Sequence, residues 1–447
     1  MEVLVVASWN APRGGLHEHV LAQARALLGA GHGCTVVCRP GSVQDRLRHA
    51  GAIVIDDDLR DEQRALEACN AAAYDLVHTH PGRAREIALH AARRRGVPLV
   101  LTLHGTRLDS LRTYAGDVDA LVVVSEAIRD FVEASEAFPP ERIVVIPNGV
   151  DPTVFHPRPP AAARAGALVE IVVATRFDRD KRFVAHVLAE AWRAQLTAAP
   201  QDRRWTIAGE GTVESLLPEL EQLAREMQRR AGEPVVRFGG WMDAPTLADL
   251  FRACDVVIAS GRGAAEAMAC GTPTIALGSR GYVGIMDEER AWAGRYGNFG
   301  GLGEQEDEYP PGALTRDLDH LLGDAGAAAR IGAYGARFAA ELLAQQPMDD
   351  LLLRLYRSLP GTRRDGPTGN ASPAPRAPIA KRVEELRQRA REAKAHAAAL
   401  GRDQRRSADR IARLERHLGK VTSSRWWRLG SGLRRVRVRL RPSGRRR

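Results

Sequence analysis

The stretch DVVIASGRGAAEAMACGTPTIALGSRGYVG, residues 255–284, decides the fold of this chain. Its first apolar run predicts a strand at Val256–Ala259, and the Gly-rich residues Ser260–Gly263 predict a turn into a short Ala-rich helix that carries Glu266. A Gly-Thr-Pro sequence ends this helix, and a second apolar run predicts the strand Thr274–Leu277. A strand, a turn and a helix in this order direct backbone N–H groups and the positive end of the helix dipole at one point. This arrangement suits a phosphate or diphosphate.

The stretch by itself leaves two interpretations open. Glu266, expected on the first turn of the helix, is placed to accept hydrogen bonds from ribose hydroxyls, as acidic residues do in dinucleotide-binding folds. The alternative is a tight turn whose carboxylate only complements the helix dipole. The rest of the chain has to decide between them.

Length and composition indicate a two-domain protein of a reducing compartment. At 447 residues with 44% hydrophobic residues, the chain is long enough for two domains and an extra module. Its five cysteines lack metal-ligand spacing and are expected to be buried thiols. The N-terminal residues show no basic leader, and no run approaches the roughly 20 apolar residues of a spanning helix. We therefore expect a cytoplasmic protein.

Residues 1–150 alternate between short apolar strands and amphipathic helices, which predicts a parallel sheet covered on both faces. Ligands of such α/β sheets bind beyond the carboxyl ends of the strands. Strands are predicted at Met1–Ala7, Thr35–Cys38, Ala52–Ile55, Leu76–His78, Leu99–Leu103, Ala120–Val124 and Ile143–Ile146, and helices at His17–Leu28, Asp61–Ala72, Arg83–Arg95 and Glu126–Glu133.

Glycines and histidines gather at the predicted ligand-binding edge of this first sheet. Gly15, in the Gly-Gly pair before the first helix, would let the backbone approach a ligand closely, unless the pair is an ordinary flexible turn. His78, His80 and His104 flank the ends of two strands. A single histidine at a strand end is usually structural, but three on one sheet edge favour a site. We expect at least one to be functional, with His104 the first candidate.

A second domain of the same kind is predicted at 168–343. The segment 147–167 contains five prolines and reads as the hinge between the domains. The helix at 344–360 is suited to cross back onto the first domain, although its apolar face fits any core. Strands are predicted at Glu170–Ala174, Arg204–Ala208 and Val235–Phe238, and helices at Phe183–Leu196, Val213–Arg230, Ala244–Ala253, Leu314–Leu322, Ala327–Gln345 and Met348–Leu359.

Two cations follow the first strand of the second domain. Arg176 and Lys181 lie in the sequence TRFDRDKR, where a guanidinium and an ammonium could grip a diphosphate together. Taken alone, this cluster would be read as a solvated loop. The Gly209–Gly211 turn and the helix with Glu266 are expected at the same sheet edge, and they favour the anion-binding interpretation.

The order of motifs resembles glycosyltransferase family 4 of the GT-B fold over residues 1–358. The matching motifs are DLVHTH, LTLHG, VVSEAI, IPNGVD, ATRFDRDKR, IAGEG and EAMACGTP. The resemblance implies two Rossmann-like doubly wound domains and metal-independent transfer of a sugar from a nucleoside-diphosphate sugar, with retention of configuration. It assigns the leaving diphosphate to Arg176 and Lys181, the donor ribose to Glu266, the phosphates to Gly15, and the reacting sugar to His104. As glycosyltransferases with a basic tail, such enzymes would act in cell-surface glycan assembly, on a glycan or lipid-linked acceptor.

One departure from the family pattern concerns the sugar pocket. Many relatives have a second glutamate eight residues before the one that matches Glu266, but Ile258 stands at that position and the loop is short. Arg262, next to Gly263 in this short loop, is expected near the diphosphate or the sugar. The interpretation is an atypical branch with a re-formed sugar pocket. The alternatives are a non-catalytic nucleotide-sugar-binding scaffold and another GT-B enzyme, such as a nucleotide-sugar 2-epimerase.

No cofactor and no metal site are expected from the sequence. The acidic run at 56–58 comes early in a loop and reads as solvated. Without a divalent cation, side-chain cations and backbone N–H groups must neutralise the leaving diphosphate.

The last 87 residues differ in charge from the rest, with 26 Lys/Arg against 7 Asp/Glu, whereas the other 360 carry 39 against 48. Residues 361–378 read as a flexible linker. Residues 379–421 keep heptad spacing with a weak Ala-rich seam, and predict either a coiled-coil dimer or a single solvated helix. Residues 422–447 combine Trp426 and Trp427 with ten arginines after Ser424, which suits an anionic membrane surface at the inner face of the cytoplasmic membrane. Nucleic acid is the rival partner, but nothing in the tail resembles a base-reading module.

Overall fold

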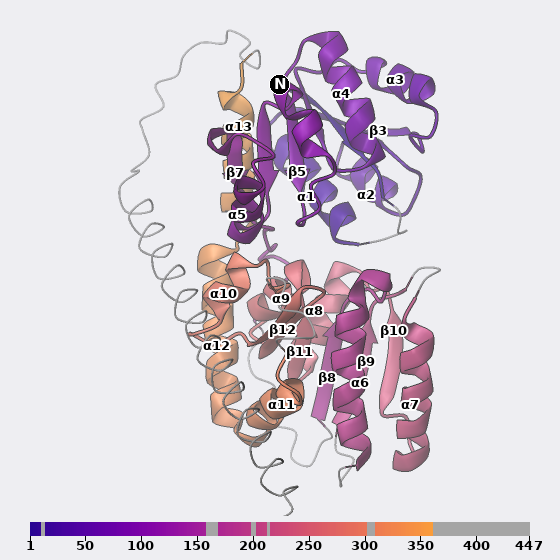
Figure 1. Ribbon diagram of the computed structural model, residues 1–447, viewed down its shortest axis with the longest axis vertical. Coiled ribbons are helices and arrows are strands. Elements are labelled where there is room, and N and C mark those ends of the chain that lie inside the picture. Colours follow the sequence, from indigo (N-terminus) through magenta and orange to yellow (C-terminus); the bar gives the residue numbers. More distant parts are fainter. Residues whose placement is uncertain (10–13, 158–168, 198–202, 212–214, 302–308, 361–447) are drawn as a thin grey trace, which may run out of the picture. The chain divides into compact units, whose positions relative to one another are not determined.

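The computed structural model describes residues 1–9, 14–157, 169–197, 203–211, 215–301 and 309–360, and these lie in one compact unit (Figure 1). The predicted linker at 361–378, coiled coil at 379–421 and basic segment at 422–447 lie outside the described residues, as does part of the predicted hinge. Among the described helices, none combines the length and the apolarity that crossing a membrane requires.

The N-terminal sheet has seven parallel strands in the order β3-β2-β1-β4-β5-β6-β7. One core, beneath α3, α4 and α5, covers one face, and a second core beneath α1 and α2 covers the other. Because both faces are buried, the strands are nearly continuous apolar runs, and this made them recognisable in the sequence. The elements are β1 Glu2–Ala7, α1 Gly15–Gly29, β2 Gly33–Cys38, α2 Val43–His49, β3 Ile53–Asp56, α3 Glu62–Asn70, β4 Leu76–Thr79, α4 Arg83–Arg95, β5 Leu99–Leu103, β6 Ala120–Val123, α5 Glu126–Ala134 and β7 Ile143–Val145.

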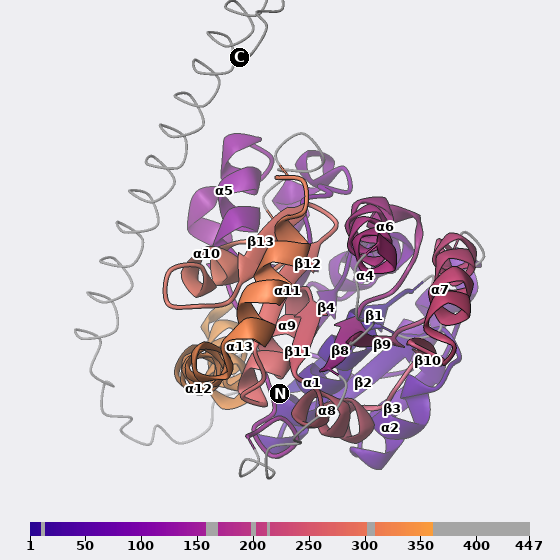
Figure 2. The same ribbon diagram turned by 90° about the horizontal axis from the view of Figure 1, so that it is seen from below.

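The C-terminal sheet has six strands in the order β10-β9-β8-β11-β12-β13. Helices α6, α7 and α11 share a core with one face, and α8, α9 and α12 share a core with the other (Figure 2). The elements are β8 Val169–Ala174, α6 Arg182–Thr197, β9 Arg203–Ala208, α7 Leu217–Ala231, β10 Val236–Gly240, α8 Ala244–Ala253, β11 Val256–Ala259, α9 Gly261–Ala269, β12 Thr274–Gly278, β13 Gly281–Ile285, α10 Ala291–Tyr296, α11 Ala313–Gly323, α12 Ala325–Leu342 and α13 Gln345–Ser358. The predicted fold class, two doubly wound Rossmann-like domains, is thereby confirmed.

One strand and two α-helices were not predicted. The strand β13 pairs antiparallel with β12 at the edge of the C-terminal sheet, and its sequence GYVGI has too few apolar residues to stand out. The helices α2 and α10 are short, at seven and six residues, so hydrophobic periodicity had little length in which to appear.

The helix in the deciding stretch begins earlier than predicted. Ser260–Gly263 was expected to be a turn, but α9 starts at Gly261, with Ser260 in the extended conformation of an N-cap residue. Arg262 therefore lies on the first turn of the helix, and Glu266 lies on the second turn rather than the first. One helical turn separates the two side chains, which places them on the same face.

The last helix, α13, returns to the N-terminal domain, as its apolar face allowed (Figure 1, orange helix beside the purple domain). Met348, Leu352, Leu353 and Tyr356 belong to the core beneath α1 and α2. The chain thus passes between the domains twice, and the two passages are paired. Val150 N–H donates to Leu343 O at 2.7 Å, and Gln345 N–H donates to Val150 O at 2.9 Å.

Candidate functional site

The predicted site residues lie at the carboxyl edges of the two sheets, where the strand order reverses. In the N-terminal sheet β1 lies between β2 and β4, and in the C-terminal sheet β8 lies between β9 and β11. At such a reversal the connections leave the strands on opposite faces, which opens a crevice for ligands. The segments after β4, β8, β9 and β11 all carry predicted residues, as does the start of α1.

Arg176 and Lys181 follow β8, with Lys181 at the end of a short 3-10 helix, Arg179–Lys181. Arg176 pairs with Asp178 at 2.6 Å, whereas the ammonium of Lys181 lies 3.4 Å from the Ser279 hydroxyl and 3.8 Å from Asp180. Burial lowers the pKa of Lys181, and the charge of Arg176 lowers it further against the opposing effect of Asp180 and Asp178. Two cations that repel each other in this way favour binding of an anion between them.

Two of the predicted site glycines have no room for a side chain. A Cβ on Gly209 would lie 1.8 Å from the carbonyl oxygen of Thr175, and one on Gly211 would lie 1.7 Å from the Ser215 hydroxyl. Both positions therefore exclude a side chain for reasons of packing alone. Gly15 is the first residue of α1 with open space where a Cβ would be, and a Cβ on its neighbour Gly14 would lie 3.6 Å from the Arg176 side chain. Gly14 therefore lies beside one of the two predicted diphosphate-binding cations.

Arg262 and Glu266 are largely buried on α9, with side-chain exposures of 16% and 10%. Their closest charged atoms are 3.9 Å apart, too far for a hydrogen bond. Within the described part of the chain, the Arg262 Nε is buried and has no hydrogen-bond partner. Burial raises the pKa of Glu266 to about 8, against the opposing charge of Arg262. Gly263 lies on the same turn, where a Cβ would make only ordinary contacts.

Three histidines of the N-terminal domain converge at the end of its sheet. His80 follows β4, His104 follows β5, and His19 projects from α1. The Nε2 of His104 lies 3.1 Å from the Nδ1 of His80, and the His19 ring lies edge-on to His104 with the ring centroids 4.7 Å apart. Burial lowers the pKa of His104 to about 4, and the pKa values of His19 and His80 lie well below the ordinary value for the same reason.

The third histidine expected at this edge has a structural role. His78 lies within β4, and its Nδ1 contacts the Tyr356 hydroxyl at 2.5 Å while its Nε2 contacts the Thr102 hydroxyl at 2.8 Å. Burial lowers the pKa of His78 to about 3, so the ring is neutral. Both nitrogens are used in joining β4, β5 and α13, which leaves none for a ligand.

Arg262 connects the two halves of the site electrostatically. Its charge lowers the pKa values of both His104 and His19, after the larger effect of burial, and it also acts on Glu266. A residue of the C-terminal domain therefore lies within reach of the histidines of the N-terminal domain. This juxtaposition joins the predicted nucleotide side of the site to the predicted sugar side.

Two motif loops also meet between the domains, and the sequence had not indicated their contact. The Nδ2 of Asn148 in IPNGVD donates to the Oδ1 of Asn298 in YGNFGG at 3.4 Å. Asn148 also hydrogen bonds to His19. No spacing in the sequence relates His19, Asn148 and Asn298, and only the fold brings them together.

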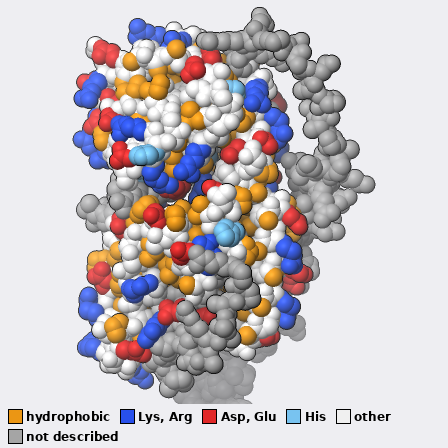
Figure 3. Space-filling model, turned by 180° about the vertical axis from the view of Figure 1, so that it is seen from behind, with side chains coloured by type: hydrophobic (Ala, Val, Ile, Leu, Met, Phe, Trp, Pro, Cys, Tyr) orange, Lys and Arg blue, Asp and Glu red, His pale blue; other side chains and the backbone are white. Residues whose placement is uncertain are grey.

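A cavity of about 780 Å³ opens beside this arrangement, between α1, α9 and α13. Glu266 and Arg262 line it together with Glu18 and Asp349. Burial raises the pKa of Asp349 to about 6. Arginines from α1, α2 and α13 supply further charge to its lining, and Figure 3 shows Lys and Arg side chains on the rim of a hollow at mid-height of the molecule. The arginines are Arg25, Arg46, Arg354 and Arg357.

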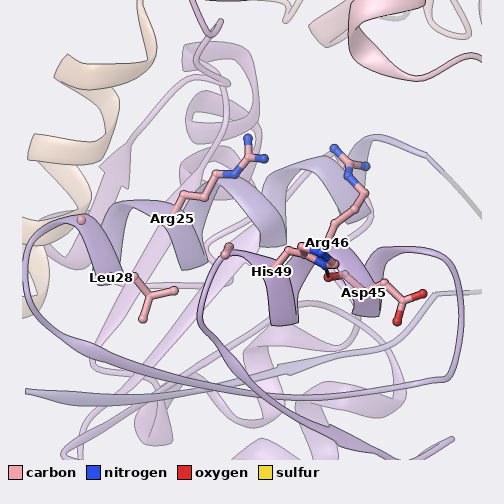
Figure 4. Close-up of a pocket in the computed structure, with 7 residues that line it drawn as sticks. Arg25, Leu28, Asp45, Arg46 and His49 are labelled. Atoms are coloured by element: carbon pink, nitrogen blue, oxygen red, sulfur yellow. Dashed lines mark hydrogen bonds between the residues drawn. The ribbon is translucent and has the colours of Figure 1, made fainter.

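A second cavity, of about 770 Å³, lies between α1 and α2 (Figure 4). Arg25, Arg46, Asp45 and His49 line it, and none of the predicted site residues does. Arg46 is held by a bidentate pair with Glu18, and the His49 ring bonds to the backbone of Asp45. Two of its polar side chains are therefore bound by neighbours, and the cavity lies apart from the residues at the sheet edges.

Comparison with protein families accounts for both domains. Residues 13–154 match the family model described as Glycosyltransferase Family 4, and residues 169–296 match the model described as Glycosyl transferases group 1.

Curated relatives extend the match beyond the single domains. A D-inositol 3-phosphate glycosyltransferase of Thermobispora bispora is 30% identical over 303 residues, which cover 60% of this chain and 67% of the relative. A protein of the same name from Kribbella flavida is 31% identical over 232 residues, covering 45% of this chain and 55% of the relative.

Solved structures share the two-domain arrangement. A glycosyltransferase from Rickettsia africae superimposes with a TM-score of 0.60 at 14% identity, covering 80% of this chain and 98% of the other. The Anabaena protein HepE in complex with UDP and glucose also gives 0.60, at 16% identity, covering 80% of this chain and all of the other.

The two Rossmann-like domains define the GT-B fold. With both domain models matched and a relative at this level of identity, the chain belongs to glycosyltransferase family 4.

Proposed function

We propose that this glycosyltransferase transfers a sugar from a nucleoside-diphosphate sugar to a glycan or lipid-linked acceptor, with retention of configuration. The observation that carries the proposal is the placement of Arg262, which lies beside Glu266 on α9, within electrostatic reach of His104 and His19. Donor-side and sugar-side groups thereby share one site. Of the structural neighbours, HepE is described in complex with UDP and with UDP-glucose, which supports a nucleotide sugar as donor here.

In the proposed reaction the bond between the sugar and the diphosphate breaks, and charge develops on the leaving phosphate oxygen. Arg176 and Lys181 neutralise this charge, with no metal ion taking part in the step. Glu266 holds the donor ribose, and the loop before α1, with Gly14 and Gly15, lies against the phosphates. The leaving phosphate oxygen accepts the proton of the acceptor hydroxyl on the same face of the sugar, so configuration is retained. His104 lies against the reacting sugar.

Release of nucleoside diphosphate from UDP-, GDP-, ADP- and TDP-sugars tests this reaction, with D-inositol 3-phosphate among the acceptors because the relatives carry that name. We expect Arg176→Ala and Lys181→Ala each to lower kcat by about 100-fold, as loss of a transition-state donor does. The matched control is Arg182→Ala, an exposed cation on the next turn, which should leave kcat unchanged. An isomerised sugar nucleotide, or binding without turnover, would instead favour an epimerase or a scaffold.

We also propose that Arg262 replaces the missing carboxylate in reading the donor sugar. Ile258 is 1% exposed inside β11, so that strand offers no polar group at this position. The guanidinium of Arg262 is mostly buried, and among described residues it has only the distant Glu266 as an ionic partner. A buried donor without an acceptor is costly, so sugar hydroxyls or a sugar carboxylate are the natural acceptors.

This role affects the sugar nucleotide but not the nucleoside diphosphate alone. We expect Arg262→Ala to lower kcat/KM for the nucleotide sugar by at least about 10-fold, the value of one charged hydrogen bond. The affinity for the nucleoside diphosphate alone should stay unchanged. Isothermal titration with the diphosphate and steady-state kinetics with the sugar nucleotide measure the two. Arg290→Ala, on an exposed arginine, is the control. If the affinity for the diphosphate fell by the same factor as kcat/KM for the nucleotide sugar, Arg262 would contact the diphosphate instead.

The basic segment at 422–447 is proposed to hold the enzyme on the inner face of the cytoplasmic membrane. Each Lys or Arg near an anionic surface contributes about 1 kcal/mol, and this segment has ten arginines and two tryptophans after Ser424. Flotation with anionic vesicles should retain the full chain and lose a chain that ends at 424; equal flotation would contradict the proposal. Dimerisation through residues 379–421 is tested by sedimentation of three proteins: the full chain, the chain that ends at 424 and a chain that ends at 378. Only the chain that ends at 378 should lose the dimer.

A further inference from the structure

The histidines His19, His80 and His104 come from three separate elements and present ring nitrogens to one another. One nitrogen from each lies within 4.8 Å of the other two. Two of these side chains approach much more closely, since His104 Nε2 and His80 Nδ1 are 3.1 Å apart. Two nitrogens bound to one tetrahedral Zn²⁺ at about 2.0–2.1 Å are separated by about 3.3 Å. The His80–His104 pair already has this spacing.

His80 would bind the ion through Nδ1, the ring nitrogen that faces His104. A neutral imidazole that binds a metal ion through Nδ1 carries its proton on Nε2. The Nε2 of His80 is buried and, among the described residues, has no hydrogen-bond partner, so no neighbour holds the ring in the other tautomer.

All three rings are in the protonation state that a metal requires. Burial is the main reason for the low pKa of each ring, and the neutral imidazole is the form that binds a metal ion. The ion would take the place of the contacts that these rings now make with one another and with Asn148.

We propose that His19, His80 and His104 form a binding site for a divalent transition-metal ion, with Zn²⁺ as the principal ion. At least one coordination position would be open toward Arg262. The site needs the His19 ring to rotate inward from its present separation, and His19 is only half-buried. This position on α1, between two strand ends, gives it room that His80 lacks.

The surroundings set which ions fit. The cluster contains imidazoles only, with no carboxylate among the described residues that form it. Neutral nitrogen ligands suit Zn²⁺, Ni²⁺, Co²⁺ and Cu²⁺, whereas Mg²⁺ and Ca²⁺ prefer oxygen. The positive charge of Arg262 opposes any dication, so the Arg262→Ala variant should bind Zn²⁺ more tightly than the natural chain.

Binding of Co²⁺ and Zn²⁺ to the full chain tests the site without any substrate, so the result does not depend on whether sugar transfer is observed. We expect one Co²⁺ per chain with the intense visible absorption of a four- or five-coordinate ion, displaced by Zn²⁺ and unaffected by Mg²⁺. His19→Gln and His104→Gln should each weaken binding by more than about 100-fold, since even an outer-shell partner is worth 10- to 100-fold. Both variants keep a side chain of similar size, and circular dichroism verifies their folding.

The matched control is His156→Gln, on an exposed histidine outside the cluster, which should bind as the natural chain does. Absence of one-to-one binding in the natural chain would overturn the site. So would binding that survives in both His19→Gln and His104→Gln, or that is lost equally in His156→Gln.

Discussion

At the scale of single residues, Glu266 shows how burial sets the chemistry of the site. Its side chain is 10% exposed, and burial raises its pKa to about 8. Arg262 opposes this effect but is too distant to cancel it. In the absence of donor the side chain is therefore mostly protonated at neutral pH. Ribose hydroxyls would supply the hydrogen bonds that stabilise its ionised form.

The raised pKa predicts a pH-dependent cost in stability. Between the usual value near 4.5 and about 8, folded Glu266 holds a proton that the unfolded chain has lost, so stability falls as pH rises through this window. We expect Glu266→Gln, which cannot ionise, to gain in relative stability from pH 5 to pH 8, with a slope of up to about 1.4 kcal/mol per pH unit. Urea unfolding at several pH values measures it. Glu226→Gln, on an exposed side chain, should show a flat difference; the same flat difference for Glu266→Gln would refute the buried-acid account.

Sequence reasoning could place the candidate site residues that directly follow strands. Arg176, Lys181 and His104 could be named because a buried strand fixes where the next few residues lie. His19 could not, because it lies within a helix and its neighbours come from other elements. The orientation of Arg262 toward the histidines also required the fold, since the sequence had placed it in a turn rather than on the face of α9 that carries Glu266.

At the scale of elements, α9 is held by an unusually close approach of α12. A Cβ on Gly332 of α12 would lie 2.2 Å from the carbonyl oxygen of Gly271, just past the end of α9. A Cβ on Gly335, one turn later, would lie 3.4 Å from the Met268 Cβ, an ordinary contact distance. These two glycines therefore differ in what they tolerate, although both are buried on the same helix.

Alanine substitution at these two positions separates packing from helix propensity. Replacing glycine by alanine within a helix gains up to about 1 kcal/mol. We expect Gly335→Ala to be neutral or stabilising, whereas Gly332→Ala should lose about 1–3 kcal/mol because the backbone of Gly271 cannot move away easily. Thermal unfolding of the two variants measures the difference. Equal stability would mean that α12 can shift away from α9 at little cost.

The boundaries of four elements were predicted correctly. The strands β5 and β11 and the helices α4 and α8 have the predicted boundaries because each is bounded by a clear turn or cap. The edge strand β13 was not predicted because an edge position does not require a continuous apolar run. The start of α9 was predicted too late because glycines at a helix N-terminus look like a turn in the sequence.

At the scale of the whole molecule, Tyr356 ties α13 to the N-terminal domain. It is fully buried, and its hydroxyl accepts from Gln23 Nε2 at 2.6 Å and contacts His78 Nδ1 at 2.5 Å. Three elements distant in sequence, α1, β4 and α13, meet at this one oxygen atom. The contact therefore holds the end of the described chain against its beginning.

Removing the hydroxyl should cost more than a single surface contact. We expect Tyr356→Phe to lower the free energy of unfolding by about 1–3 kcal/mol, because Gln23 and His78 each lose a buried partner. Tyr334→Phe, on a partly exposed tyrosine, should change it by less than about 0.5 kcal/mol. Urea unfolding followed by tryptophan fluorescence compares the two, and equal effects would show that the buried network re-forms without the hydroxyl.

The two paired passages between the domains, at Val150 and at Leu343–Gln345, have a mechanical consequence. Two segments that are hydrogen bonded side by side bend more easily out of the plane they share than within it. We therefore expect the relative motion of the domains to be a rocking about the line of this pair. Gly149 preserves the pairing, since a Cβ there would lie 2.7 Å from the Gln345 Cα. We expect such rocking to change the distance between Arg262 on α9 and His104 at the end of β5.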